Sequence, residues 1–115
     1  MYNVTVLGAG TWGTALAILL CNNGHKVTLW SKLDREVEAL TKKPEEIKNL
    51  PGAKLQREVL VTGDFKKALS EPDLIVFTVA SPFVRETAAA AKKWIRDGQI
   101  IVNAGKGIEE STMKT

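Results

Sequence analysis

Short apolar runs alternate along the chain with segments that are amphipathic or charged. Residues 4–7 read Val-Thr-Val-Leu, a β-branched stretch typical of a strand that is buried on both faces. Further strands are predicted at residues 26–30, 58–62, 73–79 and 99–104. Helices are predicted after residue 13 (with Ala15–Leu20 apolar and buried), at 33–42, from Asp64 to Leu69 and from Ser81 to Ile95. This alternation with short connections predicts an α/β fold, a doubly wound parallel sheet of about five strands.

Three glycines follow the first apolar run with the spacing Gly-x-Gly-x-x-Gly, at Gly8, Gly10 and Gly13. Gly8 allows a tight turn, Gly10 lets a phosphate approach the backbone, and Gly13 lets the helix pack closely on the strand. The N–H groups at the start of the helix favour an anion. A tight connection without a ligand produces the same spacing. The position of the three glycines between a predicted strand and a predicted helix favours a dinucleotide site in a Rossmann-like fold.

Composition narrows the class of protein. The chain has 115 residues, which fits one domain, and a net charge of +3 with the basic residues scattered. No run of Lys and Arg carries interleaved aromatic residues, which argues against nucleic acid as a partner. A single cysteine, Cys21, allows no internal disulfide. We expect no membrane span, no signal peptide and a cytoplasmic location.

The end of the second strand bears on the choice of cofactor. NAD sites usually place Asp or Glu about 20 residues after the first glycines, where the carboxylate holds the ribose 2′-hydroxyl. Here Ser31 and Lys32 stand at that place, and Asp34 lies on the following helix. Ser31 and Lys32 would tolerate or attract a 2′-phosphate, so the expected cofactor is NADP or NAD. The alternative is that Lys32 merely begins a surface helix.

Two further residues stand out by position. Lys106 lies between glycines at the carboxyl end of the fifth predicted strand, and ligands of parallel sheets bind beyond the carboxyl ends. It could reach an anionic or carbonyl oxygen, and a solvated loop lysine is an equal alternative. His25, the one histidine, precedes the second strand and therefore lies at the opposite edge. We interpret His25 as structural, and we expect no metal site.

Five segments, in order along almost the whole chain, resemble a known family. They read GAGTWGTALA, NGHKVTLWSK, VTGDFKKAL, PDLIVFTVAS and NAGKGIEEST. They are similar to the N-terminal domain of bacterial NAD(P)-dependent glycerol-3-phosphate dehydrogenase. The resemblance implies reduction of dihydroxyacetone phosphate to sn-glycerol 3-phosphate for phospholipid synthesis. It also implies that Thr11 and Trp12 contact the dinucleotide, that Lys32 lies by its adenosine end, and that Lys106 contacts both cofactor and substrate.

The same resemblance implies that residues 1–115 are a partial domain, the cofactor-binding half, truncated on the C-terminal side of the sheet. In that family a helical domain downstream supplies the lysine general base. We therefore expect no catalytic residue in this chain and no activity from it alone. The alternative is a stand-alone dinucleotide-binding module. A 6-phosphogluconate or ketopantoate type of reductase fits the glycines but not Lys-Gly-Ile-Glu at 106–109. An uncovered fifth strand would favour a homodimer or aggregation at that edge.

Overall fold

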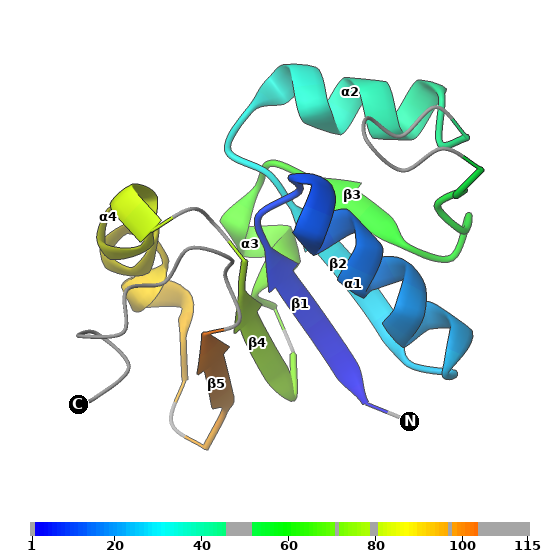
Figure 1. Cartoon of the computed structure of the whole chain (residues 1–115). Coiled ribbons are helices and arrows are strands. Elements are labelled where there is room, and N and C mark those ends of the chain that lie inside the picture. Colours follow the sequence, from blue (N-terminus) through cyan, green and yellow to red (C-terminus); the bar gives the residue numbers. More distant parts are fainter. Residues whose placement is uncertain (1, 46–51, 71, 79–80, 97, 104–115) are drawn as a thin grey trace.

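The computed structural model describes residues 2–45, 52–70, 72–78, 81–96 and 98–103 (Figure 1). Within these ranges, five strands form one parallel sheet in the order β3-β2-β1-β4-β5. Their bounds are β1 Asn3–Leu7, β2 Lys26–Trp30, β3 Leu60–Thr62, β4 Leu74–Phe77 and β5 Ile100–Asn103. The central position of β1, with β2 and β4 as neighbours, confirms the doubly wound α/β fold.

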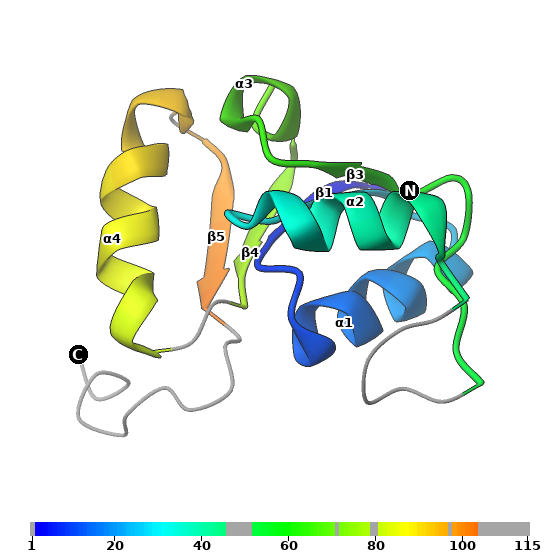
Figure 2. The same ribbon diagram turned by 90° about the horizontal axis from the view of Figure 1, so that it is seen from above.

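Four helices connect the strands in the part of the chain that is described. They are α1 Thr11–Asn22, α2 Asp34–Lys42, α3 Phe65–Ala68 and α4 Ser81–Ala91, and a 3-10 turn follows at Lys92–Trp94. Side chains of α1 and α2 pack into one core cluster, whereas those of α3 and α4 pack into another. Figure 2 shows α1 and α3 on opposite sides of the sheet. The helices therefore cover both faces.

β1 supplies both core clusters because successive side chains of a strand point to opposite faces. Val4 and Val6 belong to the cluster under α1 and α2, while Leu7 belongs to the cluster under α3 and α4. Thr5 is buried as well, and its hydroxyl donates a hydrogen bond to the Ala68 carbonyl. The prediction of a strand buried on both faces is confirmed.

The helix after the glycines differs from the sequence prediction. Its apolar residues suggested a fully buried helix, but Leu19 is 56% exposed and the buried positions are Gly13, Thr14 and Ala17. One side of the helix packs against the sheet. The other side faces solvent, although the helix is apolar in composition. Apolar content alone therefore overestimated the burial of α1.

Most element bounds are close to those predicted, with shorter ends, but α1 begins earlier than predicted, at Thr11, so Gly13 lies inside the helix. β3 begins at Leu60, and α4 ends at Ala91 before the 3-10 turn. Asp64 caps α3 as expected, because its carboxylate accepts a hydrogen bond from the Lys66 N–H at 2.9 Å.

His25 lies at the amino edge of the sheet, where its Nδ1 accepts a hydrogen bond from the Tyr2 N–H, in agreement with a structural role.

β5 is the outer strand of the described sheet on the β4 side. It pairs with β4, and its Ile100, Ile101 and Val102 side chains are exposed, Ile100 to 63%. Consecutive exposed residues belong to both faces of the strand, so neither face is fully covered here. The described part of this edge is thus open and apolar, as the sequence suggested.

The start of α1 lies unusually close to the end of β1. A Cβ placed on Gly13 would stand 1.7 Å from the Gly8 carbonyl oxygen and 2.7 Å from the Thr78 hydroxyl oxygen. Gly8 itself has a φ of +131°, in the region that favours glycine. These two glycines allow the chain to reverse from strand to helix within a few residues.

We predict that Gly13→Ala lowers the free energy of unfolding by at least about 2 kcal/mol, because the added methyl collides with backbone. Urea unfolding followed by circular dichroism measures the change. Gly10→Ala is the matched control, since its Cβ would meet nothing within 4 Å. That variant should lose less than about 1 kcal/mol. Equal losses in both variants would contradict the steric argument.

Candidate functional site

The carboxyl ends of β2, β1 and β4 lie side by side at one edge of the sheet. The chain leaves β1 into α1 on one face and leaves β4 into α4 on the other. This divergence makes the space between β1 and β4 the topological switch point, where open α/β sheets bind ligands. The structure brings the sequence-predicted residues Gly8, Gly10, Thr11, Trp12, Gly13 and Lys32 to this edge.

The glycine-rich turn is held in place from both neighbouring strands. The Gly8 N–H donates to the Trp30 carbonyl of β2 at 2.8 Å. The Thr78 hydroxyl, just after β4, donates to the carbonyl oxygens of Gly8 at 2.8 Å and Leu7 at 3.2 Å. The Thr14 hydroxyl of α1 donates to the Ala9 carbonyl at 3.1 Å. The turn is therefore fixed before any ligand arrives.

No motif in the sequence indicated Thr78 or Thr14. A hydroxyl near the carboxyl end of the predicted strand at 73–79 was the available signal for Thr78, since such a group can donate a hydrogen bond to, or accept one from, a neighbouring strand end. Its partner could not be foreseen because it depends on β4 lying beside β1, which is 70 residues away along the chain. Both threonines are buried and act on the backbone of the turn.

Gly10 is the position that points to a ligand. Its φ of −68° is open to any residue, and a Cβ there would meet nothing within 4 Å. Neither backbone strain nor packing explains glycine at this place. The open space directly before the first turn of α1 is what a phosphate needs to approach the backbone. The turn therefore fits the pyrophosphate of a dinucleotide.

Thr11 and Trp12 lie in the first turn of α1 next to this space. Both side chains are exposed, Trp12 to 46%. An exposed indole beside the open space at Gly10 is positioned to contact a flat, partly apolar ligand. Their contact with the dinucleotide, which the family resemblance implied, stays a prediction.

The end of β2 differs from the interpretation of the sequence. Ser31 is 1% exposed, and its hydroxyl donates to a Glu36 carboxylate oxygen at 2.6 Å and accepts from the Leu33 N–H at 3.0 Å. Ser31 therefore holds the start of α2 and does not offer a free hydroxyl to a 2′-phosphate. The same bond brings a carboxylate, that of Glu36, to a strand end that appeared to have none.

Lys32 is exposed at this edge and forms an ion pair with Glu86 of α4. The pair joins the segment after β2 to the helix after β4. Lys106, the other lysine singled out in the sequence, lies outside the described residues, so its contacts with cofactor and substrate stay predictions.

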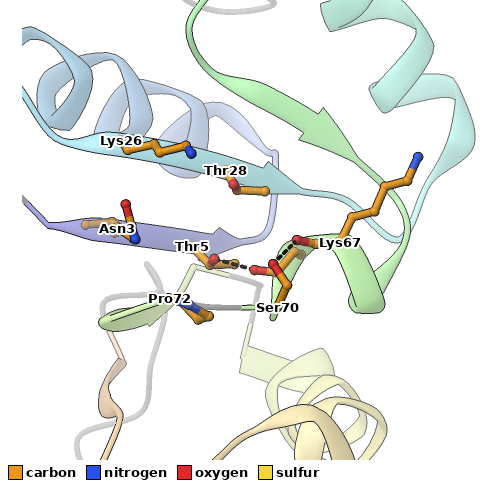
Figure 3. A pocket seen from close by; sticks show the side chains of 9 residues that line it. Asn3, Thr5, Lys26, Thr28, Lys67, Ser70 and Pro72 are labelled. Atoms are coloured by element: carbon orange, nitrogen blue, oxygen red, sulfur yellow. Dashed lines mark hydrogen bonds between the residues drawn. The ribbon is translucent and has the colours of Figure 1, made fainter.

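A polar cavity lies at the opposite edge of the sheet (Figure 3). Its lining includes Asn3 and Thr5 of β1 and Lys26 and Thr28 of β2, all within the first three residues of these strands. Residues of the segment after α3, such as Ser70, close it from below. Because ligands of such sheets bind beyond the carboxyl ends, this cavity is separate from the candidate site.

Cys21 does not contribute a reactive group. Burial raises the pKa of its thiol above the usual value, and the negative charge of Glu58 raises it further. A thiol with a raised pKa stays protonated at neutral pH and is a poor nucleophile. Cys21 packs against the core cluster under α1, which indicates a structural role.

Comparison with known proteins identifies the family. Residues 3–115 match the family described as NAD-dependent glycerol-3-phosphate dehydrogenase N-terminus. The chain belongs to this family. The resemblance found in the sequence is confirmed, and the expected cofactor, NADP or NAD, agrees with the family.

Curated relatives are similar along the whole chain. A glycerol-3-phosphate dehydrogenase (NAD(P)+) of Lactobacillus delbrueckii subsp. bulgaricus is 48% identical, and one of Agathobacter rectalis is 44% identical, each over 115 residues. Both alignments cover 100% of this chain and 34% of the relative. The chain thus spans about a third of the length of the curated relatives it matches.

Solved structures agree with the fold. Glycerol-3-phosphate dehydrogenase from Coxiella burnetii superposes with a TM-score of 0.85 at 29% identity, covering 96% of this chain and 34% of that one. A ketopantoate reductase from Ralstonia eutropha superposes at 0.71 with 24% identity, over 86% and 32% of the two chains. The second likeness shows the Rossmann-type fold alone. No helix among the described residues is both long and apolar enough to cross a membrane.

We predict that Thr78→Val lowers the free energy of unfolding by about 1–3 kcal/mol, because the Gly8 carbonyl loses a buried hydrogen bond. Chemical denaturation measures the loss. Thr41→Val is the control, because the Thr41 hydroxyl bonds to the Val37 carbonyl on the exposed side of α2. A Thr78→Val midpoint no lower than that of the control would show that the hydroxyl does not stabilise the turn.

Proposed function

We propose that residues 1–115 form the cofactor-binding domain of an NAD(P)-dependent sn-glycerol-3-phosphate dehydrogenase and bind NADP or NAD at the carboxyl edge of the sheet. The observation that carries the proposal is the turn at Gly8–Gly13, which is held by hydrogen bonds to Trp30 on one side and Thr78 on the other and leaves open space at Gly10. Membership of the glycerol-3-phosphate dehydrogenase family supports it.

The parts of the site have different tasks. Gly10 and the start of α1 receive the pyrophosphate, because helix N-termini favour anions. Trp12 and Thr11 line this contact. Lys32 lies by the adenosine end, where its charge favours a 2′-phosphate. Lys106 contacts both cofactor and substrate. When bound, the reduced nicotinamide supplies the hydride.

The substrate of the proposed reaction is dihydroxyacetone phosphate, a phosphorylated triose, and the product is sn-glycerol 3-phosphate, a phospholipid precursor. In the proposed reaction, this chain binds the cofactor and orients it. The general base is a lysine outside residues 1–115, as the family resemblance implies. We place the protein in the cytoplasm with its metabolite substrate, without nucleic acid or membrane as a partner. We further propose that the chain forms a homodimer or aggregates through the open β5 edge. The exposed apolar side chains of Ile100 and Ile101 on this strand support the proposal.

We predict that Gly10→Val weakens binding of NADH and NADPH by at least about 100-fold, because the side chain fills the space of the pyrophosphate. Isothermal titration calorimetry measures both affinities. Leu19→Ala, on the exposed side of the same helix, should bind both nucleotides as the wild type does. Undiminished NADH binding by a folded Gly10→Val protein would contradict the assignment of the site.

We predict that the 115-residue chain binds nucleotide but does not accelerate NADPH oxidation by dihydroxyacetone phosphate. The group that donates a proton to the reduced carbonyl must lie within hydrogen-bond reach of it, and the proposed lysine, which acts as the base in the reverse direction, lies elsewhere. Absorbance of the reduced nucleotide measures turnover, and sedimentation of the same sample reports its assembly. Steady turnover would contradict the proposal that the catalytic lysine lies outside residues 1–115. A monodisperse monomer would contradict the proposed association through the β5 edge.

A further inference from the structure

We propose that Glu86 is a specificity-determining residue that weakens the binding of NADP relative to NAD, by holding Lys32 in an ion pair across the site. The inference rests on the proposed function, since it assumes a dinucleotide at the carboxyl edge. It names a residue on α4 that no pattern around the glycines indicated.

The ion pair joins two segments that are far apart in the sequence. Lys32 follows β2, and Glu86 lies in the second turn of α4, which follows β4. Because β2 and β4 flank β1 in the sheet, the pair spans the carboxyl end of β1 and its glycine-rich turn. In Figures 1 and 2, the start of α2 is the end of that helix nearer to α4.

The two cofactors differ only at the adenosine ribose, where NADP carries a 2′-phosphate and NAD a hydroxyl. In this fold that ribose lies beside the end of β2, next to Lys32. A 2′-phosphate that binds Lys32 must compete with the Glu86 carboxylate for the Lys32 ammonium group. A 2′-hydroxyl, which does not need this ammonium group, imposes no such cost. Glu86 therefore weakens NADP binding and leaves NAD binding unchanged.

A second carboxylate at this edge, that of Glu36, has a different role. It accepts the hydrogen bond from the buried Ser31 hydroxyl, so its removal would loosen the start of α2. Glu86 is 60% exposed and Lys32 is 57% exposed, which makes their pair separable from the core. Exposed ion pairs are weak, so the expected effect is a few-fold change in affinity.

The test compares Glu86→Gln with a matched control, Glu38→Gln. Glu38 also forms an exposed ion pair, with Lys42 on α2, so both variants lose one negative charge and one such pair. Titration of each variant and of the wild type with NADPH and with NADH in low-salt buffer gives the affinity for each nucleotide. Glu86→Gln should bind NADPH about threefold more tightly and NADH unchanged, while Glu38→Gln should alter neither.

A double-mutant cycle shows whether Glu86 acts through Lys32. In a Lys32→Met background, Glu86→Gln should no longer tighten NADPH binding. A gain that persists there, or one that Glu38→Gln reproduces, would overturn the inference. If the wild type binds both nucleotides and Glu86→Gln changes neither affinity, this inference fails and the proposed function stands. If the wild type binds neither nucleotide, both fail.

Discussion

The close contact between the start of α1 and the end of β1 is the constraint on which the carboxyl edge depends. Gly13 must lack a Cβ because the Gly8 carbonyl and the Thr78 hydroxyl occupy its place. This contact sets where α1 begins relative to the sheet. The open space at Gly10 exists because Gly8 and Gly13, rather than Gly10, take up the steric demands of the turn.

The rest of the site is arranged around that contact by hydrogen bonds between neighbouring strands. The Trp30 carbonyl of β2 and the Thr78 hydroxyl beyond β4 both bond to Gly8. The turn is therefore tied to the two strands whose following segments carry Lys32 and Glu86. A change in the packing of β1 would alter the phosphate position and the charge arrangement together.

Elements and the glycine turn were predictable from the sequence because their signals are local. Val4–Leu7 is apolar on both faces, Asp64 stands one residue before a short helix, and Gly8, Gly10 and Gly13 have the spacing that a strand-to-helix turn needs. Burial of α1 was overestimated, because composition does not reveal how much of a helix the sheet covers. Leu19 is apolar and exposed for that reason.

By itself, the sequence determined the order of strands and helices, the glycine turn and the family, since each depends on neighbouring residues or on motifs in fixed order. The tertiary structure alone decided which side chains meet at the edge. Thr78 reaches Gly8 only because β4 lies beside β1. Glu36 folds back onto Ser31, and Glu86 reaches Lys32 across 54 residues of chain. Such contacts between distant segments depend on the packing of the whole sheet, which no local pattern encodes.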